Sequence, residues 1–237
     1  MTGTAKELLA VLTKIDWPDS VAKFGTEDAH VTRLTESLNR LALWSREFED
    51  SESSNPAIEF VREMQIQGIY TVTLASISLY RPAAAAMRAA LEAALYYSYF
   101  RTHPAELSTI ARSATYHLSK EDILEFHQIH TMGFPEREKC LNLVTELREW
   151  YRRISSVVHG KKPGSWVVHT GIADIKYNAK TLKLLVDECS TVAILINNLF
   201  LTTCGHDLWP GFSVESKRML LKGLSGQVKT TLGLSVA

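Results

Sequence analysis

The sequence lacks an excess of charge of either sign, because its 26 lysines and arginines balance its 26 aspartates and glutamates. A strongly basic protein attracts RNA, DNA or an anionic membrane through its overall electrostatic field, and this chain has no such field. Any contact with a nucleic acid must therefore come from a local cluster of basic side chains.

Cysteines are scarce as well. Cys140, Cys189 and Cys204 are far apart, odd in number and form no CxxC pair. This pattern argues against a disulfide framework and against a zinc site built from thiolates. We therefore expect a protein of the reducing cytoplasm that uses no metal or other cofactor.

Long apolar runs are also missing. The most apolar stretch, residues 192–203, is interrupted by Asn197 and Asn198. It is shorter than the roughly 20 residues that cross a bilayer, so it predicts a buried helix. Residues 1–14 mix charged and apolar side chains and lack the apolar core of a signal peptide. These features predict a chain that is neither secreted nor associated with a membrane.

Common enzyme motifs are absent too, among them a glycine-rich phosphate loop, a nucleophile elbow and paired carboxylates. The histidines His117, His127 and His130 have no cysteine nearby and no partner at a defined spacing. We interpret them as surface residues and not as metal ligands.

What is present is helical periodicity, because apolar residues recur at positions three and four apart along most of the chain. Gly68 and the β-branched residues of 70–74 weaken one helix, but a strand there would have no neighbours. The alanine-rich segment 83–100 is the strongest helix former, and its small side chains would let another helix approach closely. The predicted helices span 27–49, 56–80, 83–100, 104–115, 119–130, 135–160 and 179–203. The fold class is therefore an all-α helical bundle.

The expected organisation is one domain over residues 1–237. Its core would cover about 56–203, with additional N-terminal helices within 1–50. Residues 213–235 predict a basic, amphipathic C-terminal helix. Segment 161–178 contains prolines and glycines and predicts a loop.

The segment with the most chemical potential is 150–160, WYRRISSVVHG, which places two arginines, two serines and one histidine within about three helical turns. A histidine can take a proton from a ribose 2′-hydroxyl or give one to a leaving 5′-oxygen. An arginine can stabilise the charge that develops on phosphoryl oxygens. This combination suits RNA cleavage without a metal ion.

In this segment Arg152 and Arg153 precede His159 by six and five intervening residues. The pattern resembles the signature of HEPN proteins, in which a histidine follows an arginine after four to six residues. Tyr151 and Ser155 are also similar to residues that many HEPN chains carry in this arrangement. Further similarity comes from Gly160 and from the blocks 88–100 and 103–107, so that the resemblance covers about residues 65–160.

The resemblance implies a compact helical bundle that forms a homodimer, with the arginine and histidine of two protomers facing one another across a two-fold axis. The implied activity is that of an endoribonuclease, a hydrolase that leaves a 2′,3′-cyclic phosphate and often serves as a toxin or in antiviral defence. His159 would act as general acid or base, and Arg153 or Arg152 would stabilise the transition state. Ser155 or Ser156 would assist.

The choice between the two arginines stays open. On a straight helix Arg153 and His159 lie about 120° apart, whereas Arg152 lies one heptad before His159 and within about 20° of it. The family commonly has a polar residue after its arginine, and here Ile154 follows Arg153.

RNA binding would require a local cationic patch, which Arg148, Lys161 and Lys162 would form together with the two arginines. Basic residues on a solvated helix end are an interpretation of equal weight. Arg88 and Glu92, four positions apart, predict an ion pair along their helix, with support of Arg153 as an alternative role.

A second function remains open, namely a catalytically inactive helical module that dimerises or binds a regulatory protein or a ligand. An enzyme requires that the arginine and histidine side chains converge on an open surface. In an inactive module, by contrast, these side chains are used in internal ion pairs and in helix capping.

Overall fold

The computed structural model describes residues 3–161, 164, 166 and 169–236, and within these residues the regular structure is helical, without strands. The helices are α1 (Gly3–Leu12), α2 (Trp17–Gly25), α3 (Asp28–Glu52), α4 (Ile58–Ser76), α5 (Tyr80–Phe100), α6 (Pro104–Arg112), α7 (Lys120–His130), α8 (Phe134–Leu141), α9 (Leu143–Val158), η1 (Ile172–Asp174), α10 (Ala179–Thr203), α11 (Gly205–Leu208), η2 (Trp209–Gly211), α12 (Val214–Leu220) and α13 (Gly226–Leu232). The prediction of an all-α bundle is confirmed.

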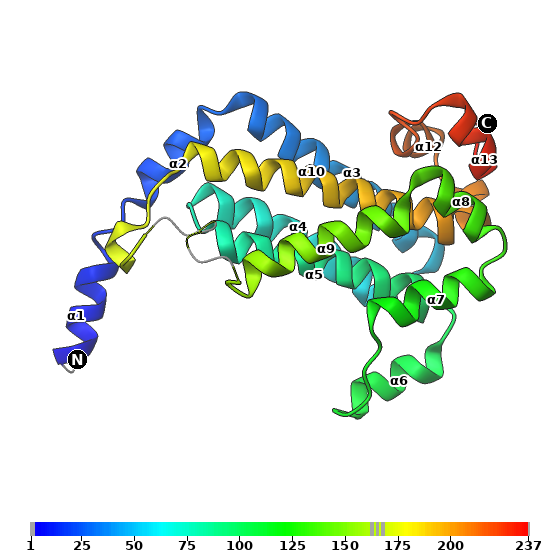
Figure 1. Ribbon diagram of the computed structural model, residues 1–237, viewed down its shortest axis with the longest axis horizontal. Coiled ribbons are helices and arrows are strands. Elements are labelled where there is room, and N and C mark those ends of the chain that lie inside the picture. Colours follow the sequence, from blue (N-terminus) through cyan, green and yellow to red (C-terminus); the bar gives the residue numbers. More distant parts are fainter. Residues whose placement is uncertain (1–2, 162–163, 165, 167–168, 237) are drawn as a thin grey trace.

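Five long helices, α3, α4, α5, α9 and α10, run alongside one another and form the body of the bundle (Figure 1). Helix α5 lies against α4, α9 and α10 and also contacts α7. Helices α1 and α6 project from this body and bury none of their residues. Helices α12 and α13 pack at one end of this body (Figure 1).

The close packing of these helices depends on small residues. Alanines of α5, among them Ala83, Ala90 and Ala94, are buried between neighbouring helices, as the composition of this segment predicts. On α4, a Cβ atom added to Gly68 would lie 2.8 Å from Leu41 Cδ1 of α3. Gly68 therefore weakens helix propensity locally but allows α3 and α4 to approach.

An aromatic cluster joins three of the long helices at the centre of the core. The Phe48 ring centroid lies 4.6 Å from that of Tyr97 and 5.0 Å from that of Phe200. Trp44 packs 5.1 Å from Phe48 and donates its indole N–H to Asn197 Oδ1 at 3.1 Å. Because α3, α5 and α10 each supply a ring, the cluster fixes their relative positions.

Helix α10 is the one described helix that is long and apolar enough to cross a membrane. However, 67% of its most apolar 18-residue window is buried inside the bundle, and the polar side chain of Asn197 is buried and hydrogen-bonded there. Helix α10 is therefore a core helix of the bundle. The prediction of a buried helix over 192–203 is confirmed.

Two segments predicted as single helices are divided in the structure. Residues 135–160 form α8 and α9, which meet at Asn142 in the left-handed conformation (φ 51°). Asparagine adopts this conformation at low cost, and hydrophobic periodicity does not detect such a break. Residues 213–235 form α12 and α13, separated by a turn that contains Gly223 (φ 89°).

Other local predictions agree with the structure. Ser119 and Asp122 form the capping box that opens α7. Part of the predicted loop 161–178 lies outside the described residues, and its described part contains only the short turn η1. Helix α3, placed by the sequence among the additional N-terminal helices, packs against α4 and α10 within the bundle.

The interpretation of His127 as a surface residue is wrong, because this residue lies on the buried face of α7 and is only 2% exposed. Its Nε2 lies 3.0 Å from Ser98 Oγ, and its Nδ1 lies 2.8 Å from Thr131 Oγ1. Burial, assisted by the charge of nearby His103, lowers the pKa of His127 to about 3. The folded protein therefore keeps this imidazole neutral.

This burial predicts a loss of stability in mild acid. The unfolded chain binds a proton at His127 near pH 6.5, whereas the folded chain does so only near pH 3. The contribution is complete above pH 6.5 and is lost as the pH falls, by about 2 kcal/mol between pH 7 and pH 5. Urea unfolding of the wild type and of His127→Gln at both pH values measures it. A difference between the two proteins that stays constant with pH would contradict the assignment.

Candidate functional site

The C-terminus of α9 places His159 immediately after the last helical residue. Gly160 has a φ of 64°, and its N–H bonds to Val157 O at 3.1 Å, while the N–H of Lys161 bonds to Ser156 O at 3.0 Å. This pair of bonds is the Schellman arrangement, which a glycine in the left-handed region makes possible. The predicted helix end near Gly160 is confirmed.

A side chain from α5 fixes this helix end. Arg81 donates from Nε and Nη2 to Val158 O at 3.1 and 2.8 Å. The guanidinium thus satisfies a terminal carbonyl and places positive charge at the negative end of the helix dipole. A Cβ atom on Gly160 would lie 2.8 Å from Arg81 Nη2, so the glycine also makes room for this contact.

Two turns further along α5, Arg88 reaches the exposed imidazole of His159. Arg88 Nη1 lies 2.7 Å from His159 Nε2. A guanidinium can only donate, so Nε2 accepts this hydrogen bond and the neutral imidazole carries its proton on Nδ1. The structure thus joins an arginine and a histidine that are 71 positions apart in the sequence.

Further contacts hold Arg88 in place. Its Nε donates to Glu92 Oε1 at 3.0 Å, and the same oxygen accepts the hydroxyl of Tyr151 at 2.6 Å. The Arg88 guanidinium and Lys120 Nζ each lie 4.7 Å from the centroid of the Tyr151 ring. Burial and the Glu92 carboxylate raise the pKa of Tyr151 to about 12, so its hydroxyl stays protonated as a donor.

A cavity of about 240 Å³ adjoins this network between α5, α7 and α9. Its polar lining comes from residues of all three helices and of the turn before α7, namely Arg88, Glu92, His117, Ser119, Lys120 and Tyr151. The network therefore borders both open solvent at His159 and a small recess with two cationic side chains.

The two arginines adjacent in sequence lie in different surroundings. Arg153 points toward α10, where its Nε lies 3.2 Å from Glu188 Oε1. Arg152 is exposed and has no hydrogen bond or ion pair with any described residue. Arg153 is thus neutralised by Glu188, whereas Arg152 is available to bind an external anion.

Arg152 shares a stripe of α9 with His159. Arg148, Arg152, Ser155 and His159 follow one another at intervals of four, three and four positions, which places them on one stripe of α9. Arg148 at one end of the stripe pairs with Glu121 of α7 at 2.8 Å, and His159 at the other end contacts α5. Arg152 lies between them.

The remaining predicted residues have less direct roles. Ser156 donates its hydroxyl to Arg153 O at 2.7 Å, and the buried Ser155 Oγ has no partner among the described residues. Lys161 is exposed beside His159, and Lys162 lies outside the described residues.

Arg88 is the residue of this site that sequence reasoning assigned elsewhere. The predicted ion pair with Glu92 is present at 3.0 Å, but the same arginine also bonds His159. In the sequence, its spacing to Glu92 indicates only the ion pair. No local sequence pattern indicates that α5 meets the end of α9.

Among the described residues, no three histidine, cysteine, aspartate or glutamate side chains are grouped so that they could hold a metal ion. No protein-family model, curated protein or solved structure matches the chain. Functional inference therefore rests on the arrangement of the side chains themselves.

The hydrogen bond from Arg88 predicts the tautomer of His159. At a pH where the imidazole is neutral, ¹⁵N chemical shifts should show a protonated Nδ1 and an unprotonated Nε2. Replacement Arg88→Leu removes the donor, so the preference for this tautomer should be lost. Arg153→Leu, on the other side of α9, should leave it unchanged. A wild-type spectrum with the proton on Nε2 would refute the contact.

Proposed function

We propose that the protein is a metal-independent endoribonuclease of HEPN type that acts as a cytoplasmic toxin or antiviral effector. The observation that carries the proposal is the 2.7 Å contact between Arg88 and the exposed His159. A proton acceptor and a phosphate-binding cation lie side by side at the surface, which is the pairing that cleavage next to a ribose 2′-hydroxyl requires.

His159 would act as the general base. Its Nε2 lone pair accepts the proton of the 2′-hydroxyl, whose oxygen attacks the adjacent phosphorus. The new O2′–P bond forms as the P–O5′ bond breaks, and the 5′-oxygen takes a proton from a general acid. The products are a 2′,3′-cyclic phosphate and a 5′-hydroxyl. In the proposed homodimer, a second copy of the chain supplies that acid.

Arg88 would stabilise the phosphoryl oxygens. Its Nε donates to Glu92 and its Nη1 to His159 Nε2. A phosphate that accepts from Arg88 would also compete for Nη1 and release His159 Nε2 toward the 2′-hydroxyl. Tyr151 and Glu92 would act as positioning residues that hold the guanidinium in this orientation.

Arg152 would be the second arginine of the site. It shares the stripe of His159 and lacks a partner among the described residues, whereas Arg153 is paired with Glu188. Together with Lys120 and Lys161 it would give the local positive charge that an RNA backbone requires in a chain of zero net charge. We therefore assign the working role to Arg152.

A second candidate is a catalytically inactive module that binds a ligand or regulator through the same face. The observation in its favour is that Arg88 is already held by Glu92 and His159 in the unliganded protein. The two candidates differ in whether any RNA bond is broken.

The decisive experiment incubates purified wild type and four variants with labelled RNA in EDTA and analyses the product ends. Wild type should give cyclic phosphates. His159→Ala should lose about 10²- to 10⁴-fold in rate, and Arg88→Ala and Arg152→Ala about 10²- to 10³-fold. Arg153→Ala, the matched control, should stay active because its side chain is neutralised by Glu188.

Circular dichroism of each variant shows that it is folded. Cleavage that persists in His159→Ala would remove this histidine from the reaction. A wild type that binds RNA without cleaving it would favour the inactive module.

A further inference from the structure

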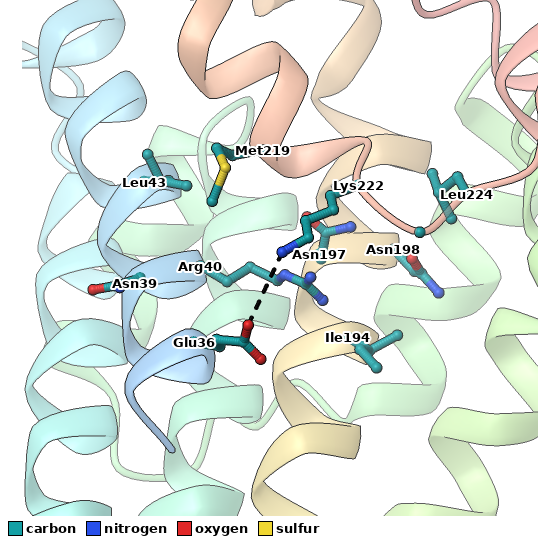
Figure 2. A pocket seen from close by; sticks show the side chains of 11 residues that line it. Glu36, Asn39, Arg40, Leu43, Ile194, Asn197, Asn198, Met219, Lys222 and Leu224 are labelled. Carbon is teal, nitrogen blue, oxygen red and sulfur yellow. Dashed lines mark ion pairs between the residues drawn. The ribbon is translucent and has the colours of Figure 1, made fainter. Parts of the chain in front are cut away.

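A second cavity, of about 370 Å³, lies between α3, α10 and the turn after α12 (Figure 2). It is at the end of the bundle where α12 packs, whereas the C-terminus of α9 with His159 is toward the other end (Figure 1). The two sites share no lining residue. An inference about this cavity is therefore independent of RNA cleavage.

The unusual feature of the cavity is Arg40 of α3. Its side chain is only partly exposed, yet its guanidinium has no hydrogen bond or ion pair with a described residue. Burial lowers the pKa of Arg40, and the Glu36 carboxylate offsets this effect in part. Charged groups that are shielded from water are normally paired, so an unpaired guanidinium here predicts an external anion.

Comparison with other arginines supports this interpretation. Arg33, two turns earlier on α3, bonds Asp187 at 2.7 Å and Ser190 at 3.2 Å across the same helix pair. Arg152 and Arg218 also lack partners among the described residues, but both are exposed and remain hydrated. Arg40 alone among these combines partial burial with five unused donors.

A second observation comes from α10. Asn198 is 7% exposed and lines the cavity, and its Oδ1 is buried without a hydrogen bond to a described residue. Its neighbour Asn197 uses both ends of its amide, on Trp44 and on Leu220 O. A buried, unsatisfied acceptor is destabilising, and a ligand donor would remove this cost.

The rest of the lining defines the ligand further. At the rim, Lys222 Nζ lies 4.0 Å from Glu36 Oε1, and both side chains are about two-thirds exposed. Such a loose surface pair contributes little, so Lys222 is free to turn toward an anion. Figure 2 shows Lys222 and Arg40 extending into the same region. Apolar walls come from Leu43, Ile194, Met219 and Leu224.

We propose that this cavity binds a phosphate monoester whose organic part carries a hydrogen-bond donor, a class that includes the nucleoside monophosphates. The phosphate lies on the Arg40 guanidinium, whose planar fork matches two phosphate oxygens, with Lys222 as a second cation. The organic part lies against the apolar walls and donates to Asn198 Oδ1. The volume of about 370 Å³ is that of a small-molecule site.

The test is isothermal titration calorimetry with AMP, CMP and inorganic phosphate on the full chain. AMP or CMP should bind the wild type more tightly than phosphate does. Arg40→Ala should weaken nucleotide binding about 10- to 100-fold, the value of charge-assisted hydrogen bonds. The control Arg218→Ala, an unpaired arginine of α12 that does not line the cavity, should leave binding unchanged.

A third variant tests the role of the amide. Asn198→Leu should remove the advantage of the nucleotides over phosphate and, because it deletes an unsatisfied polar group, should not lower the unfolding temperature. Equal affinity of the wild type for phosphate and nucleotides would overturn the proposal. So would nucleotide binding that survives Arg40→Ala, or the failure of both nucleotides to bind at about 1 mM, the weak end of specific affinities.

Discussion

The small side chains of α5 are the constraint on which the rest of the structure depends. Because alanines occupy its buried faces, α4, α9 and α10 can all pack against one helix. The charged residues of α5 then lie along its boundary with α9, where Arg81 caps the helix end and Arg88 meets His159. Larger side chains at these alanine positions would push α9 away from Arg81 and Arg88. The contacts of the candidate site would then be lost although its own residues were unchanged.

Placement of the arginines decides which positive charges remain available. In a chain without net charge, most arginines are neutralised locally: Arg153 by Glu188, Arg148 by Glu121 and Arg33 by Asp187. What remains is uneven. Arg152, on the α9 stripe of His159, and Arg40, which lines a cavity with Asn198, lack partners among the described residues, as does the exposed Arg218 of α12. The zero net charge therefore conceals local positions where an anion would be attracted.

The sequence predicts most of what depends on local chemistry. Helical periodicity identifies the core helices, Ser119 and Asp122 predict a capping box, and Gly160 predicts the end of α9, all of which the structure contains. The break at Asn142 was missed, because apolar residues keep their spacing across it. The burial of His127 was missed because it depends on the packing of α7 against α5, which supplies Ser98, whereas Thr131 is a local partner at the end of α7.

The candidate site divides in the same way. His159 and the neighbouring arginines are adjacent in sequence, but the contact of His159 with Arg88 depends on how α5 and α9 pack. Periodicity does distinguish Arg152 from Arg153, since a heptad returns Arg152 to the face of His159. Periodicity does not show which helix packs against each face of α9. In the structure, α10 brings the carboxylate of Glu188 to Arg153 but not to Arg152. The same helix packing that neutralises one arginine therefore leaves the other exposed, on the face of α9 that carries His159 two turns further along.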